Sequence, residues 1–238
     1  MEYYYTPKEY ISSGSLTIVD DEAKHLGKVL RKNAGDELFV TDGLGTLYRV
    51  KISTAAKSLI ECTILEKLPG INEPKTKVTL YQSLIKNPDR FEFSIEKSVE
   101  LGVYEIFPLI TEHTINKTTS KIERWQSIAL SAMKQSQRCL LPRVNSPLPF
   151  ADAVTSCKAG IKLIADETAA VDNPNSDAGF RRFAGTESIA VFVGPEGGFS
   201  PEEVQLAVSN GFERLSLGPR KFRSETASIL ALGLILCS

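Results

Sequence analysis

The stretch Ile189-Ala-Val-Phe-Val-Gly-Pro-Glu-Gly-Gly-Phe-Ser-Pro-Glu-Glu203 decides the fold of this chain. Its first five residues are apolar and rich in β-branched side chains, as in a buried strand. A glycine-rich turn at 194–198 follows. Ser200 then suits a helix N-cap, Pro201 the first helical position, and Glu203 the partner in a capping box. The stretch therefore predicts a strand, a turn and a helix in immediate succession.

The glycine-rich turn is a candidate ligand site, because glycines let a ligand approach the backbone closely. In open α/β sheets, ligands bind beyond the carboxyl ends of the strands. Two further predicted strand ends carry polar residues or glycine, at 164–167 and 215–225. A tight strand-to-helix connection with no ligand accounts for the turn equally well, so the turn alone leaves both interpretations open.

The rest of the chain predicts two domains. Before residue 68, short alternating segments favour a small β-barrel, with strands at 15–19, 38–40, 47–52 and 58–65. Pro69–Pro74 is typical of a linker. After it, strands alternate with helices, which favours a mainly parallel α/β sheet, with strands at 78–81, 105–108, 161–165, 189–193 and 214–217 and helices at 89–101, 122–133, 201 onward and 224 onward. We therefore expect domains at 1–70 and 75–238, and a mobile loop at 166–178.

Composition excludes several classes of protein. The 238 residues are 42% hydrophobic with a net charge of −1, so the chain lacks the basic surplus of a nonspecific nucleic-acid binder, although a local basic face remains compatible. Four cysteines without metal-ligand spacing, and only two histidines, argue against a metal site and favour free thiols in a reducing cytosol. The most apolar run, 229–237, is too short to span a bilayer, and no leader peptide is expected.

The chemistry of the turn points away from a phosphate ligand. Neither a P-loop nor a dinucleotide-binding fingerprint occurs, and Glu196 would repel phosphate. An acid among glycines suits a ligand that carries donors or positive charge. S-adenosylmethionine, with its sulfonium and ammonium groups, is consistent with that requirement.

The segment after the last predicted strand is dense in cations. Arg220, Lys221 and Arg223 precede a helix that starts at Ser224, where the helix dipole disfavours positive charge. We expect them to face an RNA phosphate or a substrate carboxylate. A solvated turn partly neutralised by Glu225, ion-paired to Arg223, is the alternative. The helix that follows, 227–236, has little polar face and must be buried in the core or in a subunit interface.

Two smaller features lie on other predicted helices. Gln135 and Arg138, three residues apart, would share a helix face. An ordinary polar face is the favoured interpretation of that pair. His25 with Arg31 would offer RNA contacts from the first domain, although a single helical histidine is more often structural.

Taken together, these motifs resemble the ribosomal RNA small subunit methyltransferase E family of the SPOUT methyltransferases. The resemblance covers nearly the full length and keeps the order and spacing of the motifs His25–Arg31, Phe91–Val103, Trp125–Ala129, Gln135 with Arg138 and Pro142, Gly194–Gly198 and Leu217–Ala227. It implies an N-terminal PUA-like β-barrel that binds RNA and a C-terminal SPOUT α/β domain with a deep trefoil knot. It also implies a cytoplasmic homodimer.

The resemblance further implies a reaction: methylation of N3 of one uridine in the 16S rRNA of the 30S ribosomal subunit, with S-adenosyl-L-methionine as cofactor and no metal. Another RNA target, such as a tRNA ribose 2′-hydroxyl, and a non-catalytic RNA-binding assembly factor are the alternatives. Family members carry arginine near the N-terminus where this chain has Met1–Tyr5, and Ile-Leu or Val-Leu in place of Lys221-Phe222. Despite these departures we still expect the cofactor to bind, whereas the detailed RNA contacts are expected to differ from those of the family.

The candidate site residues fall into three groups. The cofactor-binding group comprises Ile164, Ala165, Asp166, Val193, Gly194, Pro195, Glu196, Gly197, Gly198, Leu215, Leu217, Gly218 and Arg220. The catalytic group comprises Arg220 and Arg223, as stabilisers of the anion that develops on the uracil ring, and Glu225, as a proton acceptor. The RNA-binding group comprises His25, Lys28, Arg31, Gln135 and Arg138.

Overall fold

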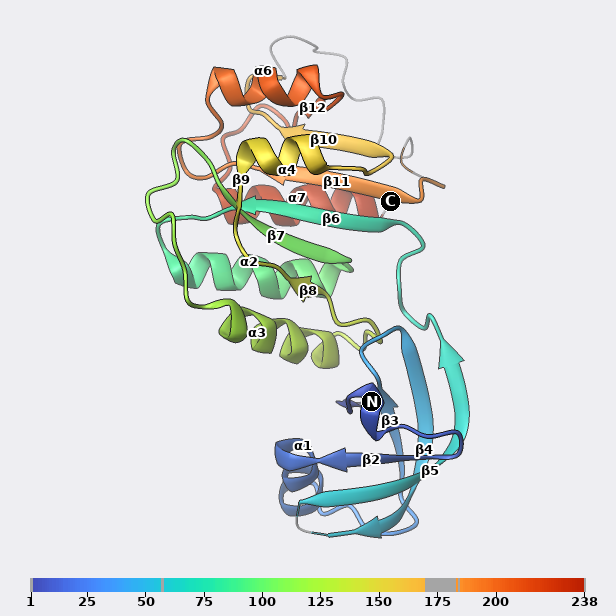
Figure 1. Cartoon of the computed structure of the whole chain (residues 1–238). Coiled ribbons are helices and arrows are strands. Elements are labelled where there is room, and N and C mark those ends of the chain that lie inside the picture. The colour runs from blue at the N-terminus through green and yellow to red at the C-terminus, as the bar shows by residue number, and fades with distance from the viewer. Residues whose placement is uncertain (1, 57, 170–182, 184, 238) are drawn as a thin grey trace. The chain divides into compact units, whose positions relative to one another are not determined.

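The structure is a computed structural model that describes residues 2–56, 58–169, 183 and 185–237. By its internal contacts the chain divides into two compact units (Figure 1). The first comprises Met1–Glu73 and Met133–Leu141, and the second Pro74–Ala132 and Pro142–Ser238. The expected division, 1–70 and 75–238, placed 133–141 in the second domain. Most of the loop expected at 166–178 lies outside the described residues.

Within the described residues, the first unit contains a curled five-stranded sheet in the order β1-β3-β4-β5-β2. The strands are β1 (Tyr3–Tyr5), β2 (Ser15–Val19), β3 (Glu37–Thr41), β4 (Thr46–Ala55) and β5 (Leu59–Pro69). Two register shifts in the β4–β5 pair allow these long strands to bend. The Thr6 hydroxyl donates to the Thr17 carbonyl across 2.6 Å, which joins the chain after β1 to the opposite edge strand β2. The expected barrel is therefore a curled half-barrel.

The helical segments of this unit are short. A turn of 3-10 helix, η1, covers Lys8–Tyr10, α1 covers Asp20–Lys24, and a π-helical segment, η2, covers His25–Val29. The helix ends before Arg31, whose φ is +52°. Leu16, Ile18 and Val50 are among the buried side chains that fill the inner face of the sheet.

The second unit is a sheet in the order β12-β10-β11-β6-β7-β8, with β9 beside β7, and every pairing is parallel. The strands are β6 (Lys77–Ser83), β7 (Glu105–Ile110), β8 (Arg143–Val144), β9 (Leu148–Pro149), β10 (Ile161–Ala165), β11 (Ser188–Val193) and β12 (Glu213–Leu215). The predicted parallel sheet is confirmed. Because the strands are parallel, their carboxyl ends and the loops that follow them share one edge.

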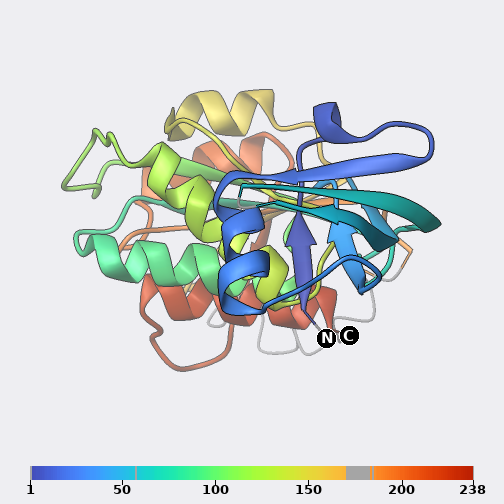
Figure 2. The ribbon, with the colours of Figure 1, turned by 90° about the horizontal axis from the view of Figure 1, so that it is seen from below.

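Helices cover both faces of this sheet. They are α2 (Pro88–Leu101), α3 (Ile122–Gln135), α4 (Phe150–Ser156), α6 (Pro201–Ser209) and α7 (Ser224–Leu236). Figure 2 shows α4 on one side of the sheet and α2 and α7 on the other. Under α4 and α6, Tyr81 stacks on Phe192 at 4.2 Å between ring centroids, and Phe212 meets Phe192 edge-on at 4.7 Å. This aromatic core fixes β6 and β11 side by side.

The opening stretch folds as its residues predict. Ser200 and Glu203 form the capping box, with Pro201 in the first helical turn. No helix among the described residues is long and apolar enough to cross a membrane. Cys62, Cys139 and Cys157 are buried, Cys237 is exposed, and all four are free thiols.

Candidate functional site

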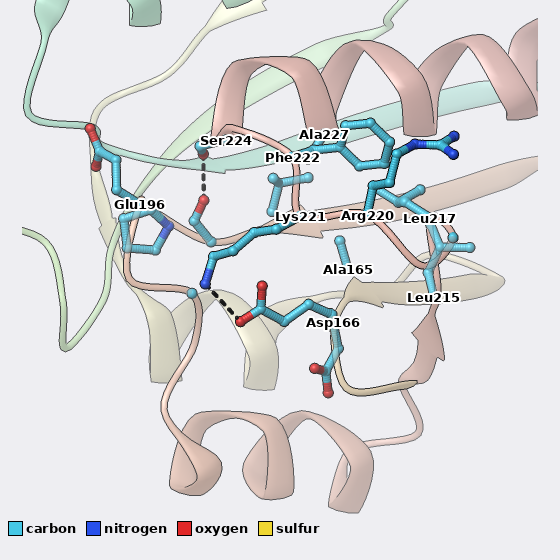
Figure 3. A pocket seen from close by; sticks show the side chains of 16 residues that line it. Ala165, Asp166, Glu196, Leu215, Leu217, Arg220, Lys221, Phe222, Ser224 and Ala227 are labelled. Carbon is cyan, nitrogen blue, oxygen red and sulfur yellow. Dashed lines mark hydrogen bonds and ion pairs between the residues drawn. The ribbon is translucent and has the colours of Figure 1, made fainter. Parts of the chain in front are cut away.

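A pocket lies where β10, β11 and β12 end, at the carboxyl edge of the parallel sheet (Figure 3). Its volume is about 580 Å³ including space open to solvent. Its lining comes from three loops and the start of α7. The lining residues are Ala165, Asp166, Glu167, Val193, Gly194, Pro195, Glu196, Gly198, Leu215, Leu217, Gly218, Arg220, Lys221, Phe222, Ser224 and Ala227.

The glycines of the 194–198 turn serve different purposes. Gly198 has φ +71°, a left-handed conformation that disfavours any side chain. A Cβ on Gly194 would lie 3.0 Å from the Gly198 carbonyl carbon, so Gly194 allows the turn to close. Gly197 does not line the pocket, because its missing side chain faces His113 at 3.2 Å. The expectation that Gly197 accommodates the ligand is therefore not supported by its position.

Glu196 is engaged with the neighbouring loop. Its carboxylate accepts a hydrogen bond from the backbone N–H of Lys86 at 3.2 Å, in the loop that follows β6. Figure 3 shows Glu196 and Arg220 at opposite ends of the pocket. The charge of Glu196 thus serves at least partly to hold two loops together, a role that its place among glycines does not indicate.

The loop after β10 is closed by its own ion pair. Arg214 donates to Asp166 at 2.8 Å, and the same carboxylate accepts from the backbone N–H of Thr168 at 2.9 Å. Asp166 therefore shapes the pocket wall. Ile164 has no exposed surface and packs in the aromatic core, so it supports the pocket without lining it.

The cationic segment before α7 splits into distinct positions. Arg220 lines the pocket, and its guanidinium lies 5.9 Å from the Phe222 ring centroid. Lys221 forms an ion pair with Glu167 at 3.1 Å across the pocket (Figure 3). Arg223 is exposed at the N-cap position of α7 and is not among the lining residues.

Glu225 faces α2. Its side chain is 10% exposed, and its carboxylate lies 3.7 Å from Nε of Arg90 in the first turn of α2. Glu225 is absent from the pocket lining. Glu225 therefore forms an ion pair with Arg90, whereas the sequence suggested a pair with the neighbouring Arg223.

A buried polar network anchors α7 beneath the turn. Gln82 in β6 is 1% exposed and donates to the Ser224 hydroxyl at 2.7 Å. Ser224 in turn donates to the Gly194 carbonyl, and the Gln82 carbonyl accepts from Ser94 and Ser228. Sequence reasoning missed this network. Its signal is a glutamine at the end of an apolar strand together with serines on otherwise apolar helix faces.

The RNA-binding candidates of the first unit differ in exposure and in their partners. Arg138 is 2% exposed and donates to Glu73 at 2.6 Å through Nη2 and 3.1 Å through Nε. This buried pair overturns its assignment as an RNA contact, and α3 ends at Gln135, so the two residues do not share a helix. His25 lies 3.9 Å from Glu2, Arg31 and Gln135 are exposed, and the side chain of Lys28 lies outside the described residues.

Comparison with known families defines the class of the protein. An RNA methyltransferase domain family matches residues 72–236, and an RNA methyltransferase PUA domain family matches residues 18–65. The curled sheet of the first unit is thus PUA-like, and the pocket lies within the methyltransferase match.

Individual relatives narrow the class. The ribosomal RNA small subunit methyltransferase E of Mesomycoplasma hyopneumoniae is 38% identical over 71% of this chain and 73% of its own length. That of Synechocystis is 34% identical over 95% of this chain and 74% of its own length. The crystal structure of the Neisseria gonorrhoeae enzyme, bound to S-adenosylmethionine, matches with a TM-score of 0.84 and 32% identity over 98% of this chain and 95% of that one. The chain belongs to the ribosomal RNA small subunit methyltransferase E family.

Proposed function

We propose that this protein is an S-adenosylmethionine-dependent methyltransferase that methylates N3 of a uridine in the 16S rRNA of the cytoplasmic 30S subunit. The observation that carries this proposal is the pocket at the carboxyl ends of β10, β11 and β12. Family membership and the S-adenosylmethionine in the gonococcal relative support it.

The pocket residues fit the cofactor. Leu215, Leu217 and Phe222 provide apolar surface for an adenine ring, and the Gly194 and Gly218 segments bring backbone polar groups to the wall. Gly218 has φ +102°, so this approach depends on glycine. Glu167 and Glu196 place carboxylates beside a site that would hold a cationic ligand. When bound, the cofactor supplies an electrophilic methyl group on its sulfonium.

The residues of the chain must handle a proton and an anion. Loss of the N3 proton leaves negative charge on the two carbonyl oxygens of uracil, and a fixed cation stabilises that charge. We propose Arg220 for this role, because among the residues that the structure describes it is the arginine that lines the pocket. Arg223, three residues further along and exposed, is the second candidate.

The position of Glu225 supports a structural role better than the role of proton acceptor. Its carboxylate is held against Arg90 and lies outside the pocket lining. We propose that Glu225 positions Arg90 and the start of α7, and so acts through the neighbouring backbone of Ser224.

The direct test is methyl transfer from labelled S-adenosylmethionine to purified 30S subunits, followed by nucleoside analysis. The proposal predicts 3-methyluridine in 16S rRNA. A labelled 2′-O-methylribose would indicate another SPOUT-type target, and no labelled nucleoside with intact cofactor binding would indicate a non-catalytic assembly factor.

We propose that RNA also contacts the PUA-like unit, through His25, Lys28, Arg31 and Gln135. PUA family membership supports this role. Arg138 is excluded from it, because a buried ion pair leaves its guanidinium no surface to offer. The chain's net charge of −1 implies that affinity depends on local basic patches.

A trefoil knot and a homodimer complete the proposal. After β12 the chain returns to the sheet, where Ser224 bonds both to Gln82 in β6 and to the Gly194 carbonyl after β11, and this contact supports the proposed knot. On α7, Ile229, Leu230, Leu234 and Leu236 remain half-exposed. An apolar strip of this kind supports burial against a second copy of the chain.

A further inference from the structure

A second cavity lies at the same edge of the sheet, beyond the ends of β6 and β7. Its walls are the loop after β6, the 111–121 segment that joins β7 to α3 (Figure 1), and the starts of α2 and α3. Its volume is about 880 Å³ including space open to solvent. None of the cofactor-binding or catalytic candidates is among its lining residues.

The cavity is strongly basic in a chain that is nearly neutral. Lys86, Lys117 and Lys121 line it, and no acidic residue does among the described residues. The Lys121 ammonium lies 3.7 Å from the Glu92 carboxylate. That carboxylate already accepts hydrogen bonds from Nε and Nη2 of Arg124, each at 2.7 Å. In the described part of the chain, the side-chain ammonium groups of Lys86 and Lys117 have no acidic partner. Such a cluster is suited to phosphate groups.

The cavity also has an aromatic wall with an unused donor. Phe91 and Trp125 pack with ring centroids 4.5 Å apart. Trp125 is 2% exposed, and its indole N–H has no hydrogen-bond partner in the described structure. A buried donor without a partner is unfavourable unless a ligand or water supplies an acceptor. Ile115, at the rim, is 66% exposed, an apolar surface beside the lysines.

The loop that borders this cavity also borders the cofactor pocket. Lys86 lines the cavity with its side chain, while its backbone N–H donates to Glu196 of the pocket at 3.2 Å. His113, in the segment that forms another wall, contacts the Gly198 carbonyl at 3.1 Å. An RNA strand that places one nucleotide at the pocket would bring an adjacent nucleotide to the cavity.

We infer that this cavity binds an unpaired nucleotide of the substrate RNA, flanking the methylated uridine. The base occupies the cavity beside Phe91, Trp125 and the apolar rim at Ile115, and the adjoining phosphates contact Lys86 and Lys117. Unpaired RNA bases are recognised by such a combination of aromatic surface, polar donors and cations. This inference rests on the proposed function, since it assumes an RNA substrate.

The first experiment compares two double variants in methyl transfer to 30S subunits. Lys86→Ala/Lys117→Ala removes two cavity lysines, and Lys75→Ala/Lys158→Ala removes two exposed lysines near the amino ends of β6 and β10. We expect the cavity variant to raise KM for subunits about 10-fold or more at 0.1 M salt, with S-adenosylmethionine affinity unchanged. It should also flatten the salt dependence of kcat/KM, by about 0.7 in log–log slope for each phosphate that the variant no longer neutralises. The control variant should match wild type in both.

Equal KM and equal salt slopes for the two double variants would overturn the inference while leaving the proposed function intact. Absence of methyl transfer by the wild type would instead remove the proposed function. The RNA site is then decided by fluorescence, because Trp125 is the sole tryptophan of the chain.

For fluorescence, the protein saturated with S-adenosylhomocysteine is titrated with hexauridylate. We expect hexauridylate to quench Trp125 fluorescence. The apparent affinity from this quenching should fall about 10-fold in the cavity double variant and stay unchanged in the lysine control. Absence of quenching by RNA would overturn the inference. A Trp125 fluorescence change that depends on protein concentration alone would also overturn it, because the cavity would then be covered by a second copy of the chain.

Discussion

At the scale of single residues, the glycine-rich turn divides into positions that require glycine for separate reasons. Position 198 requires glycine because its φ is positive, and position 194 because a side chain would collide with the backbone of Gly198. Position 197 requires glycine because a side chain would crowd His113. Sequence marks all three equally, because spacing carries no information on dihedral angle. Only the folded backbone distinguishes a glycine that serves the ligand site from one that serves packing.

We predict that Gly198→Ala weakens S-adenosylmethionine binding. A Cβ at this position meets nothing within 4 Å, so the substitution is unfavourable only because the backbone is left-handed, at about 1–2 kcal/mol. Relaxation of the backbone away from this conformation would distort the pocket wall. Gly211→Ala is the matched control, since its φ is +81° with equally open space, in the turn that follows α6. Both variants should lose similar stability in urea unfolding. Calorimetry should show weaker cofactor binding for Gly198→Ala alone, and equal affinities would mean that the turn does not form the site.

The second residue-scale prediction concerns Glu225. As a positioning residue held against Arg90, its change to glutamine should lower the single-turnover rate of methyl transfer less than about 10-fold, with a similar effect for Arg90→Gln. Loss of Arg220, in Arg220→Ala, should cost about 100-fold or more, as for other electrostatic stabilisers of a developing anion. A loss of about 100-fold for Glu225→Gln, with Arg90→Gln near wild type, would restore Glu225 as proton acceptor.

At the scale of elements, most of the second unit follows from local pattern. The capping box at Ser200 and Glu203, the strand at 161–165 and the helix starting at Ser224 lie where the residues predict. The short elements β1, β8, β9 and α4 were missed, because two to seven residues carry too little periodicity to stand out. Gln82 was missed for another reason: its partner Ser94 lies on the next helix, whereas Ser224 and Ser228 lie on a helix more than 140 residues further along, and only the assembled sheet brings them together.

We predict a pH-dependent contact between α2 and the start of α3. The Arg124 guanidinium beside Glu92 holds the pKa of that carboxyl below its ordinary value, with Lys121 adding to the effect. Stabilisation by Glu92 is therefore complete above the ordinary glutamate pKa and is lost as pH falls through the lower pKa of the folded state. Relative to Glu92→Gln, wild type should be more stable by about 1 kcal/mol at pH 7, since Arg124 is largely exposed, and the difference should shrink below about pH 4.

The measurement is urea unfolding of both proteins from pH 7 to pH 3.5. Glu123→Gln, which alters an exposed acid in the first turn of α3, serves as control and should show a smaller difference. A stability difference for Glu92→Gln that stays constant down to pH 3.5 would contradict the assignment of the lowered pKa to this carboxyl.

At the scale of the whole molecule, the net charge of −1 conceals a strong local asymmetry. Lys86 is far in the sequence from Lys117 and Lys121, and the three form no basic motif, yet they line one cavity. Arg138 shows the converse, a cation that sequence placed on an RNA face and that folding buries against Glu73. Composition bounds the total charge, whereas topology decides which charges meet, and this is why the cofactor loops were predictable as strand ends and the second cavity was not.

The last prediction concerns the proposed homodimer. The half-buried strip of α7 formed by Ile229, Leu230, Leu234 and Leu236 is apolar. Substituting Ile229 by aspartate would place a charge on it without opening the core, since that side chain is only half-buried. We expect Ile229→Asp to sediment as a monomer where the wild type sediments as a dimer. Val208→Asp, at an apolar position of α6 that is 41% exposed, is the control and should leave the oligomeric state unchanged. If both variants sediment as wild type, the strip serves another contact. If Ile229→Asp is monomeric and still methylates 30S subunits at the wild-type rate, each pocket is complete within one chain.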